Sequence, residues 1–305
     1  MEKPAICGGT PIRSQKISYG HQYIDEEDIQ AVVEVLRSDY LTCGPKIAEA
    51  ERALCEVTGA KYAVVCSNGT AALHMACQAA GVQPGDEVIT TPITFAASAN
   101  CAFYCGARPV FADINEETYN IDPENVRRLT TEKTKAVVAV DFTGQSVELD
   151  ALLSHCHEKG ITLIEDGAHV IGTKYKGRCN GSIADMTTLS FHPVKTVTCG
   201  EGGAVLTNDE KLYRKLLLYR AHGITRDPSL MEHEPDGPWY YEQLTLAMNY
   251  RMTDMQAALL ISQLKKLPMF MERRKEIVKR YNEAFSKLPQ IIVQKEIRES
   301  DTTRH

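Results

Sequence analysis

A single lysine, Lys195, lies in a loop that could make it a nucleophile. The loop runs from Ser190 to Gly203, is rich in glycine and small polar residues, and connects two short apolar stretches at 186–189 and 204–207. Its proline and glycine content argues against a helix interior. A lysine held between two buried strands loses contact with bulk water, which lowers the pKa of its amine and frees the neutral nucleophile. An ordinary surface lysine fits the same pattern, so the loop alone leaves both interpretations open.

A second segment has the composition of a phosphate-binding turn. The stretch from Cys66 to Leu73 follows an apolar run and begins a predicted helix, with Gly69 and Thr70 at its start. Small residues and free N–H groups at a helix start predict a cradle for a single phosphate. The stretch lacks the spacing of a P-loop or of a dinucleotide-binding turn. A plain helix cap is the alternative interpretation.

An acid, Asp166, stands at the end of another predicted strand. A carboxylate there can cap a helix, or it can hold a heteroaromatic nitrogen protonated. In an open sheet, ligands bind beyond the carboxyl ends of the strands, so we expect Asp166, Lys195 and the phosphate cradle to meet. Together they predict pyridoxal 5′-phosphate (PLP), which the lysine would bind as an imine. Phe95, after a further strand end, could stack on the ring or belong to the core.

These segments need an open α/β sheet to bring them together. Continuous apolar runs such as 136–140 indicate strands buried on both faces, and they alternate with helix patterns, which predicts a mostly parallel sheet between helices. The predicted strands are Tyr62–Cys66, Glu87–Thr91, Pro109–Ala112, Ala136–Phe142, Thr162–Glu165, Met186–Leu189 and Ala204–Thr207. Helices are predicted from Asp25 and Pro45, and at Thr70–Ala80, Ala96–Cys105, Glu124–Leu129, Leu149–Lys159, Glu210–His222, Asp254–Leu267 and Met269–Leu288. We expect a large domain over 1–250, then connecting helices and the start of a small domain over 251–305, with a possible strand at 291–293.

Composition narrows the class of protein. The 305 residues carry a net charge of −6, which argues against a nucleic-acid partner. No apolar run approaches the length of a membrane span, so we expect no membrane partner either. The ten cysteines form no C-x-x-C pair and lie mostly in apolar stretches, which indicates reduced thiols and a cytoplasmic protein. We expect no metal site, because the neighbours in His155-Cys156-His157 would point in different directions on a helix.

Five motifs resemble those of the DegT-type sugar-nucleotide aminotransferases, a family of fold-type I PLP enzymes. They are Leu41-Thr42-x-Gly44-Pro45, Ser67-Asn68-Gly69-Thr70-Ala71-Ala72-Leu73, Glu165-Asp166-x-Ala168-His169, Ser190-Phe191-His192-Pro193-x-Lys195 and Gly200-Glu201-Gly202-Gly203. The resemblance runs from about Tyr19 to His305. It implies a large PLP-binding domain with a seven-stranded, mostly parallel sheet, and a small C-terminal domain that this chain contains in part. Family members continue well beyond the position of His305, so we expect cofactor binding with weakened turnover.

The resemblance also implies a role for each matching residue. Lys195 resembles the Schiff-base lysine that moves the proton, Asp166 the partner of the pyridine nitrogen, and His169 the residue beside the ring hydroxyl. Contacts to the phosphate and to the ring face are implied for Gly69, Thr70, Ser190 and Phe95.

The resemblance also implies residues that act in the active site of the neighbouring subunit. Asn249 matches a residue that reaches the phosphate of the neighbouring subunit, which implies a homodimer with shared sites. Substrate contacts are expected at Arg251, Tyr19 and Arg226.

The expected reaction is the transfer of an amino group from L-glutamate, through PLP, to C4 of a nucleotide-linked 4-keto-6-deoxy sugar. The family branch that makes UDP-4-amino-4,6-dideoxy-N-acetyl-β-L-altrosamine for pseudaminic acid is similar at 222–227, 237–243 and 249–254, which implies UDP-2-acetamido-2,6-dideoxy-4-keto-L-arabino-hexose as substrate. Another aminotransferase of the family is the alternative. Dehydratase members carry histidine in place of the lysine, so Lys195 argues against that reaction despite nearby His192. A PLP-binding protein without catalysis is the alternative outside the enzymes.

Overall fold

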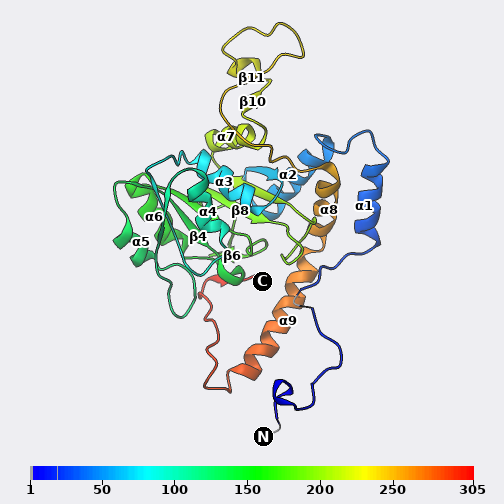
Figure 1. The fold of residues 1–305 in the computed structure, drawn as a ribbon, viewed down its shortest axis with the longest axis vertical. Coiled ribbons are helices and arrows are strands. Elements are labelled where there is room, and N and C mark those ends of the chain that lie inside the picture. The colour runs from blue at the N-terminus through cyan, green and yellow to red at the C-terminus, as the bar shows by residue number, and fades with distance from the viewer. Residues whose placement is uncertain (1–2, 19) are drawn as a thin grey trace.

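A seven-stranded sheet forms the centre of the computed structural model, which describes residues 3–18 and 20–305 (Figure 1). Its order is β1-β9-β8-β5-β4-β2-β3, and of these strands only β9 is antiparallel to its neighbours. The strands are β1 (Tyr62–Cys66), β2 (Glu87–Thr90), β3 (Arg108–Phe111), β4 (Thr134–Val140), β5 (Thr162–Asp166), β8 (Met186–Ser190) and β9 (Gly203–Thr207). All seven predicted strands are therefore confirmed, with ends displaced by at most two residues.

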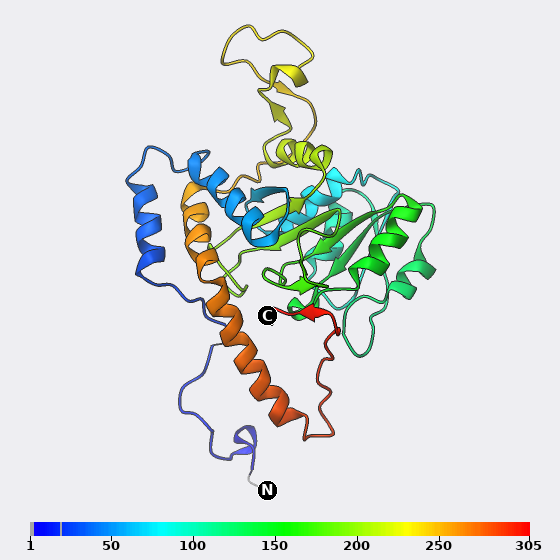
Figure 2. The same ribbon diagram turned by 180° about the vertical axis from the view of Figure 1, so that it is seen from behind.

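Helices cover both faces of this sheet, so the architecture is a three-layer α/β fold (Figures 1 and 2). One face packs against α3 (Gly69–Ala79), α4 (Ala97–Tyr104) and α7 (Glu210–Arg220). The other packs against α2 (Pro45–Thr58) and α8 (Asp254–Lys265) at one end, and against α5 (Pro123–Leu129) and α6 (Leu149–Lys159) at the other. Each predicted helix corresponds to one α-helix; the remaining two are α1 (Glu26–Leu36) and α9 (Leu267–Phe285).

The strands have continuous apolar sequences because helices cover both faces of the sheet. Neighbouring residues of a strand point to opposite faces, so a strand buried on both faces needs apolar side chains at every position. Val64 and Val138 belong to the core under α3, α4 and α7. Their neighbours Val65 and Val137 belong to the cores on the opposite face.

Short strands complete the fold. A three-stranded sheet contains β6 (Lys174–Tyr175), β7 (Arg178–Cys179) and β12 (Ser300–Asp301). The prediction of a possible strand at 291–293 is wrong, because these residues form no regular element. Ile292 is 77% exposed, so its side chain does not pack against an apolar face. Within the described ranges no helix is both long and apolar enough to cross a membrane. The ten cysteines are all free thiols.

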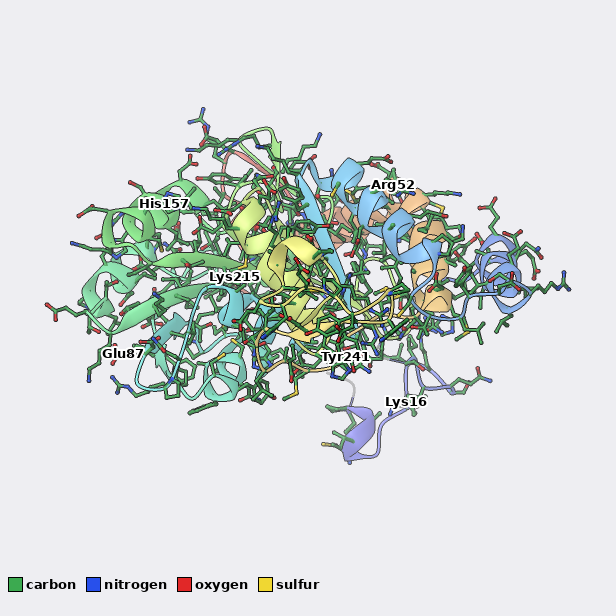
Figure 3. All side chains as sticks on the ribbon, turned by 90° about the horizontal axis from the view of Figure 1, so that it is seen from above. Lys16, Arg52, Glu87, His157, Lys215 and Tyr241 are labelled. Carbon is green, nitrogen blue, oxygen red and sulfur yellow. The ribbon has the colours of Figure 1, made fainter. Side chains whose placement is uncertain are left out.

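An arm, residues 222–250, projects from the body beyond α7 (Figure 1). Its stem is the pair β10 (Ile224–Thr225) and β11 (Glu242–Gln243). Viewed from above, Tyr241 of the arm lies over the middle of the molecule, with Glu87 and His157 towards one side and Arg52 towards the other (Figure 3). The arm exposes large apolar side chains, among them Trp239 and Leu246 at 69% and 86%. The protein therefore presents an apolar surface far from its own core.

A side chain of α8 caps the start of α2. Gly44 stands at the N-cap of α2 and offers no side chain to the free N–H groups there. The carboxylate of Asp254 accepts hydrogen bonds from the N–H groups of Gly44 and Lys46, at 2.8 and 3.0 Å. An added Cβ at Gly44 would lie 2.7 Å from the Asp254 carboxylate, so the close approach requires glycine. The Gly44-Pro45 motif is thus tied to Asp254, 210 residues away.

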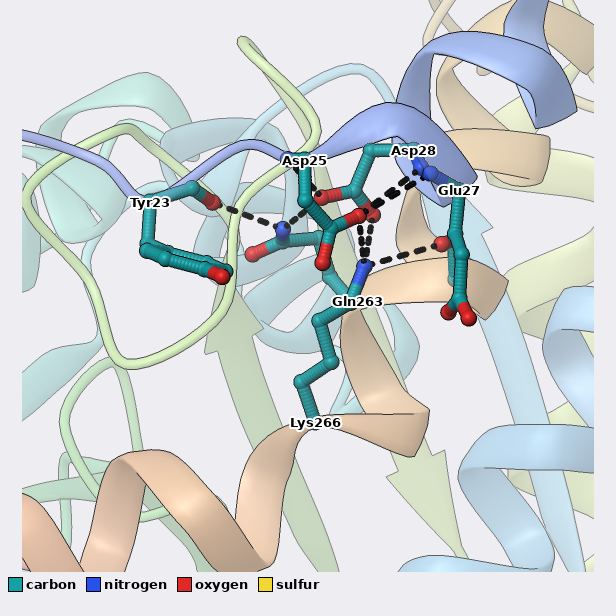
Figure 4. Close-up of polar contacts among 7 residues, drawn as sticks. Tyr23, Asp25, Glu27, Asp28, Gln263 and Lys266 are labelled. Carbon is teal, nitrogen blue, oxygen red and sulfur yellow. Dashed lines mark hydrogen bonds and ion pairs between the residues drawn. The ribbon is translucent and has the colours of Figure 1, made fainter.

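Buried charges anchor the start of α1 to the junction of α8 and α9 (Figure 4). Lys266 lies 2.7 Å from Asp25 and 2.8 Å from Asp28, whose side chain is fully buried. The amide of Gln263 donates to the Tyr23 carbonyl and to Asp28. Burial opposes both charges, but their hydrogen bonds outweigh it and lower the pKa of Asp28 while raising the pKa of Lys266. The charged forms of both groups therefore stabilise the fold.

Lys266→Met should destabilise the protein by about 3 kcal/mol at pH 7, because it leaves a buried carboxylate without its cation. The pKa of Asp28 is lowered on folding, so its contribution is present above the unfolded pKa and is lost as the pH falls through the folded one. The contribution of Asp28 should therefore persist down to its unfolded pKa of 3.8, and the deficit of the variant should shrink as the pH falls below that value. Urea unfolding at several pH values measures it.

Lys295→Met is the matched control, since it removes an exposed pair with Glu117 and should cost less than about 1 kcal/mol. A deficit for Lys266→Met that equals the control, or that does not change with pH, would contradict the assignment.

Candidate active site

A cavity of about 990 Å³ opens at the carboxyl ends of the parallel strands. It is lined by residues that follow or end β1, β2, β4, β5 and β8, as expected for an open α/β sheet. The sequence-predicted residues that it brings together are Gly69, Thr70, Phe95, Asp166, His169, Ser190 and Lys195. The start of α3, Asp166 and Lys195 thus meet around one cavity, as expected, while the role of each residue stays a prediction.

The start of α3 and the end of β8 form one end of the cavity. Asn68 caps α3, with its side chain accepting the N–H of Ala71 at 2.8 Å. A Cβ added at Gly69 would lie 2.9 Å from Cβ and 3.1 Å from Oγ of Ser190, so only glycine lets the turn approach that hydroxyl. Free N–H groups, a helix dipole and a serine hydroxyl together suit a phosphate.

The position of Asp166 at the end of β5 buries its carboxyl group beside the cavity. Oδ1 accepts the N–H of Ala168 at 3.2 Å, and Oδ2 accepts the hydroxyl of Ser98 at 2.5 Å. Burial raises the pKa of Asp166, against the hydrogen bonds and the charge of Lys195. A buried acid with these donors can protonate a ring nitrogen and then remain as a stabilised carboxylate. Our sequence analysis missed Ser98, because nothing in the sequence marks a contact across 68 residues.

A tight turn after β8 holds Lys195, whose N–H donates to the His192 carbonyl at 2.8 Å. Burial lowers the pKa of the Lys195 amine, and the charge of Asp166 opposes this effect. The direction is the one expected for a nucleophilic amine. An exposed lysine on an ordinary loop, the alternative interpretation, does not describe this half-buried residue.

The ring of His169 is neutral at ordinary pH. Burial, with the nearby His305 and Lys195, lowers the pKa of His169 to about 2. Its ring stacks on that of His305 with centroids 3.9 Å apart. Its Nδ1 atom is buried and has no hydrogen-bond partner among the described residues. His169 also lines the cavity, which is compatible with the predicted position beside the ring hydroxyl of PLP.

Phe95 also lines the cavity, and the residue is 77% exposed. The alternative that Phe95 is a core residue is therefore wrong. The ring is available to stack on a flat ligand.

Three other predicted residues, Asn249, Arg251 and Arg226, do not line this cavity. Asn249 is exposed, and its side chain accepts the N–H of Arg251 at 3.4 Å. Arg226 lies on the arm, with its guanidinium 5.7 Å from the ring of Tyr241. Tyr19 lies outside the described residues. A shared site with a second copy thus stays a prediction.

Tyr250, which the sequence analysis did not single out, does line the cavity. Its hydroxyl lies 2.9 Å from Nδ1 of His74 on α3, and its carbonyl accepts the N–H of Ser67 at 2.8 Å. These contacts hold Tyr250 beside the start of α3.

Comparisons with known proteins agree with this site. Residues 22–305 match the model of the DegT/DnrJ/EryC1/StrS aminotransferase family. A UDP-4-amino-4,6-dideoxy-N-acetyl-beta-L-altrosamine transaminase of Campylobacter jejuni subsp. jejuni serotype O:23/36 is 42% identical over 274 residues, which cover 89% of this chain and 70% of that protein.

Two solved structures share the fold. PseC of Helicobacter pylori, an aminotransferase involved in the biosynthesis of pseudoaminic acid, has a TM-score of 0.83 and 36% identity, over 90% of this chain and 72% of its own. The PLP form of the putative sugar aminotransferase Spr1654 from Streptococcus pneumoniae has a TM-score of 0.85 and 32% identity, over 95% of this chain and 77% of its own. The chain belongs to the DegT/DnrJ/EryC1/StrS aminotransferase family, whose members are PLP-dependent sugar aminotransferases.

Proposed function

We propose that the chain transfers an amino group from L-glutamate, through PLP, to C4 of a nucleotide-linked 4-keto-6-deoxy sugar. The observation that carries the proposal is the single cavity in which Lys195, Asp166 and the start of α3 meet. The specific candidate is UDP-2-acetamido-2,6-dideoxy-4-keto-L-arabino-hexose of the pseudaminic acid pathway. The altrosamine transaminase and PseC among the relatives support this choice.

The residues of the chain have distinct tasks in this reaction. PLP, when bound, supplies an electron sink for the pair released when an α-proton leaves. Lys195, with its lowered pKa, binds the cofactor covalently and carries the proton at its amine. Asp166 holds the proton of the ring nitrogen, and the neutral His169 bonds the ring hydroxyl. Gly69, Thr70 and Ser190 bind the phosphate.

The proposal includes a homodimer with shared sites. The arm carries Arg226 away from the cavity of its own subunit and exposes Trp239 and Leu246. A second copy of the chain would offer a surface that both the Arg226 charge and these apolar side chains could contact. Asn249 and Arg251 at the base of the arm would then complete the neighbouring site. Arg226 of the arm and Arg251 at its base would supply attraction for the substrate anion although the chain has a net charge of −6.

Lys195→Ala should lose the absorbance band of the imine between PLP and the lysine, because no amine remains to form it, and should show only the band of PLP bound without a covalent bond. Conversion of bound PLP to the amine form by L-glutamate should slow by at least about 10²-fold, since the proton carrier is lost. Stopped-flow absorbance measures both. Lys174→Ala, which changes an exposed lysine of β6, should leave the absorbance band of bound PLP and the rate of its conversion by L-glutamate unchanged.

A Lys195→Ala protein that keeps the band and the glutamate response would sink the proposed role. A wild-type band that ignores glutamate would favour the non-catalytic alternative. Amination of other 4-keto sugar nucleotides in preference to the candidate, followed by mass spectrometry, would favour a different aminotransferase of the family.

The shared site predicts a defined pattern of complementation. Lys195→Ala and Asn249→Ala chains alone should each give impaired sites, whereas mixed dimers should contain one intact site, from Lys195 of one chain and Asn249 of the other. Random mixing should restore roughly a quarter of the wild-type glutamate rate, because half of the dimers are mixed and each has one working site in two.

Sedimentation at equilibrium is the companion measurement for the dimer. Failure of the mixture to exceed the average of its two components would show that Lys195 and Asn249 do not meet across subunits.

A further inference from the structure

The strongest contact of Asp166 outside its own strand comes from Ser98 on α4. Ser98 is fully buried, and its Oγ lies 2.5 Å from Oδ2 of Asp166. The hydroxyl of Thr94 lies 2.7 Å from that of Ser98. Thr94 also lines the cavity. A chain of two hydroxyl groups therefore runs from the cavity wall to the buried acid.

Helix capping does not explain the positions of these two hydroxyl groups. Thr94 and Ser98 stand at the start of α4, where a side chain often binds a free backbone N–H. In the described structure the start of α4 has no side-chain cap, and the two hydroxyls contact each other and Asp166 instead. The two hydroxyl groups are thus arranged to bind the carboxyl group of Asp166 and not the backbone of the helix.

The chemistry of a carboxylate fixes the direction of the hydrogen bonds. An ionised carboxyl group only accepts, so Ser98 must donate its one proton to Asp166. The oxygen of Ser98 then accepts from Thr94, and each bond polarises the next. Both hydroxyl dipoles consequently point their positive ends at the negative charge.

The acid needs such support because its site is dry. Burial raises the pKa of Asp166, while the bond from Ser98 and the N–H of Ala168 lower it. A protonated ring nitrogen requires an ionised partner, since an acid that keeps its proton leaves the nitrogen neutral. Loss of Ser98 would move the proton from the ring nitrogen towards Asp166.

We propose that Thr94 and Ser98 are positioning residues that orient Asp166 towards the ring nitrogen of PLP and stabilise its ionised state. The inference deepens the proposed function and rests on Asp166 as the partner of that nitrogen. Neither residue touches the reacting atoms, so their effect must pass through Asp166. A cofactor without a ring nitrogen should therefore be insensitive to their loss.

The test compares PLP with 1-deaza-PLP, in which carbon replaces the ring nitrogen. Ser98→Ala in the full chain should weaken PLP binding about tenfold and binding of the deaza analogue less than about twofold, because a hydrogen bond to a charged group is lost only in the first case. Ser98→Thr should restore the PLP affinity. Thr90→Val is the matched control: it removes a buried hydroxyl bonded to the Val138 carbonyl, away from Asp166, and should not separate the two cofactors.

A second readout follows the proton directly. In ¹⁵N NMR of bound, labelled PLP, the ring-nitrogen signal should move towards the neutral pyridine position in Ser98→Ala, and less far in Thr94→Val. Thr94→Val keeps the proposal testable if Ser98→Ala does not fold. Equal losses for PLP and its analogue, or an unchanged ¹⁵N signal, would overturn the proposal and assign Ser98 a structural role. If Asp166→Asn also binds both cofactors like the wild type, the proposed role of Asp166 fails instead.

Discussion

The placement of β9 between β1 and β8 is the constraint on which the active site depends. The register sets Gly203 of β9 opposite Cys66 on one side and Ser190 on the other. An added Cβ at Gly203 would lie 2.4 Å from the Asn68 carbonyl, so the turn after β1 passes directly over this strand. The turn that begins α3 therefore meets the end of β8, from which the Lys195 loop starts. A shift of one residue in either pairing would separate the phosphate end from the lysine.

Much of this arrangement is readable in the sequence, because strands buried on both faces and helices with free starts leave local patterns. All seven strands of the sheet and the lining of the cavity by Gly69, Asp166 and Lys195 could be predicted in this way. Contacts between distant elements leave no such pattern. The bond from Ser98 to Asp166, the cap that Asp254 gives to α2 and the exposure of Phe95 depend on how helices dock on the sheet. The expected strand at 291–293 failed for the same reason, since an apolar run forms a strand only where an edge accepts it.

Three acidic residues, Asp141, Glu165 and Asp166, lie close together at the ends of β4 and β5. Glu165 is fully buried and receives hydrogen bonds from Asn180, Gly181 and Thr187. Burial, with the charge of the adjacent Glu165, raises the pKa of Asp141 well above its usual range and so favours its uncharged form. The buried carboxyl group of Glu165 is thus met by hydrogen-bond donors, and neither Asp141 nor Glu165 lines the cavity. Of the three acids only Asp166 lines the cavity, so a ring nitrogen bound there would meet one carboxyl group, whose pKa burial raises and Ser98, Ala168 and Lys195 lower.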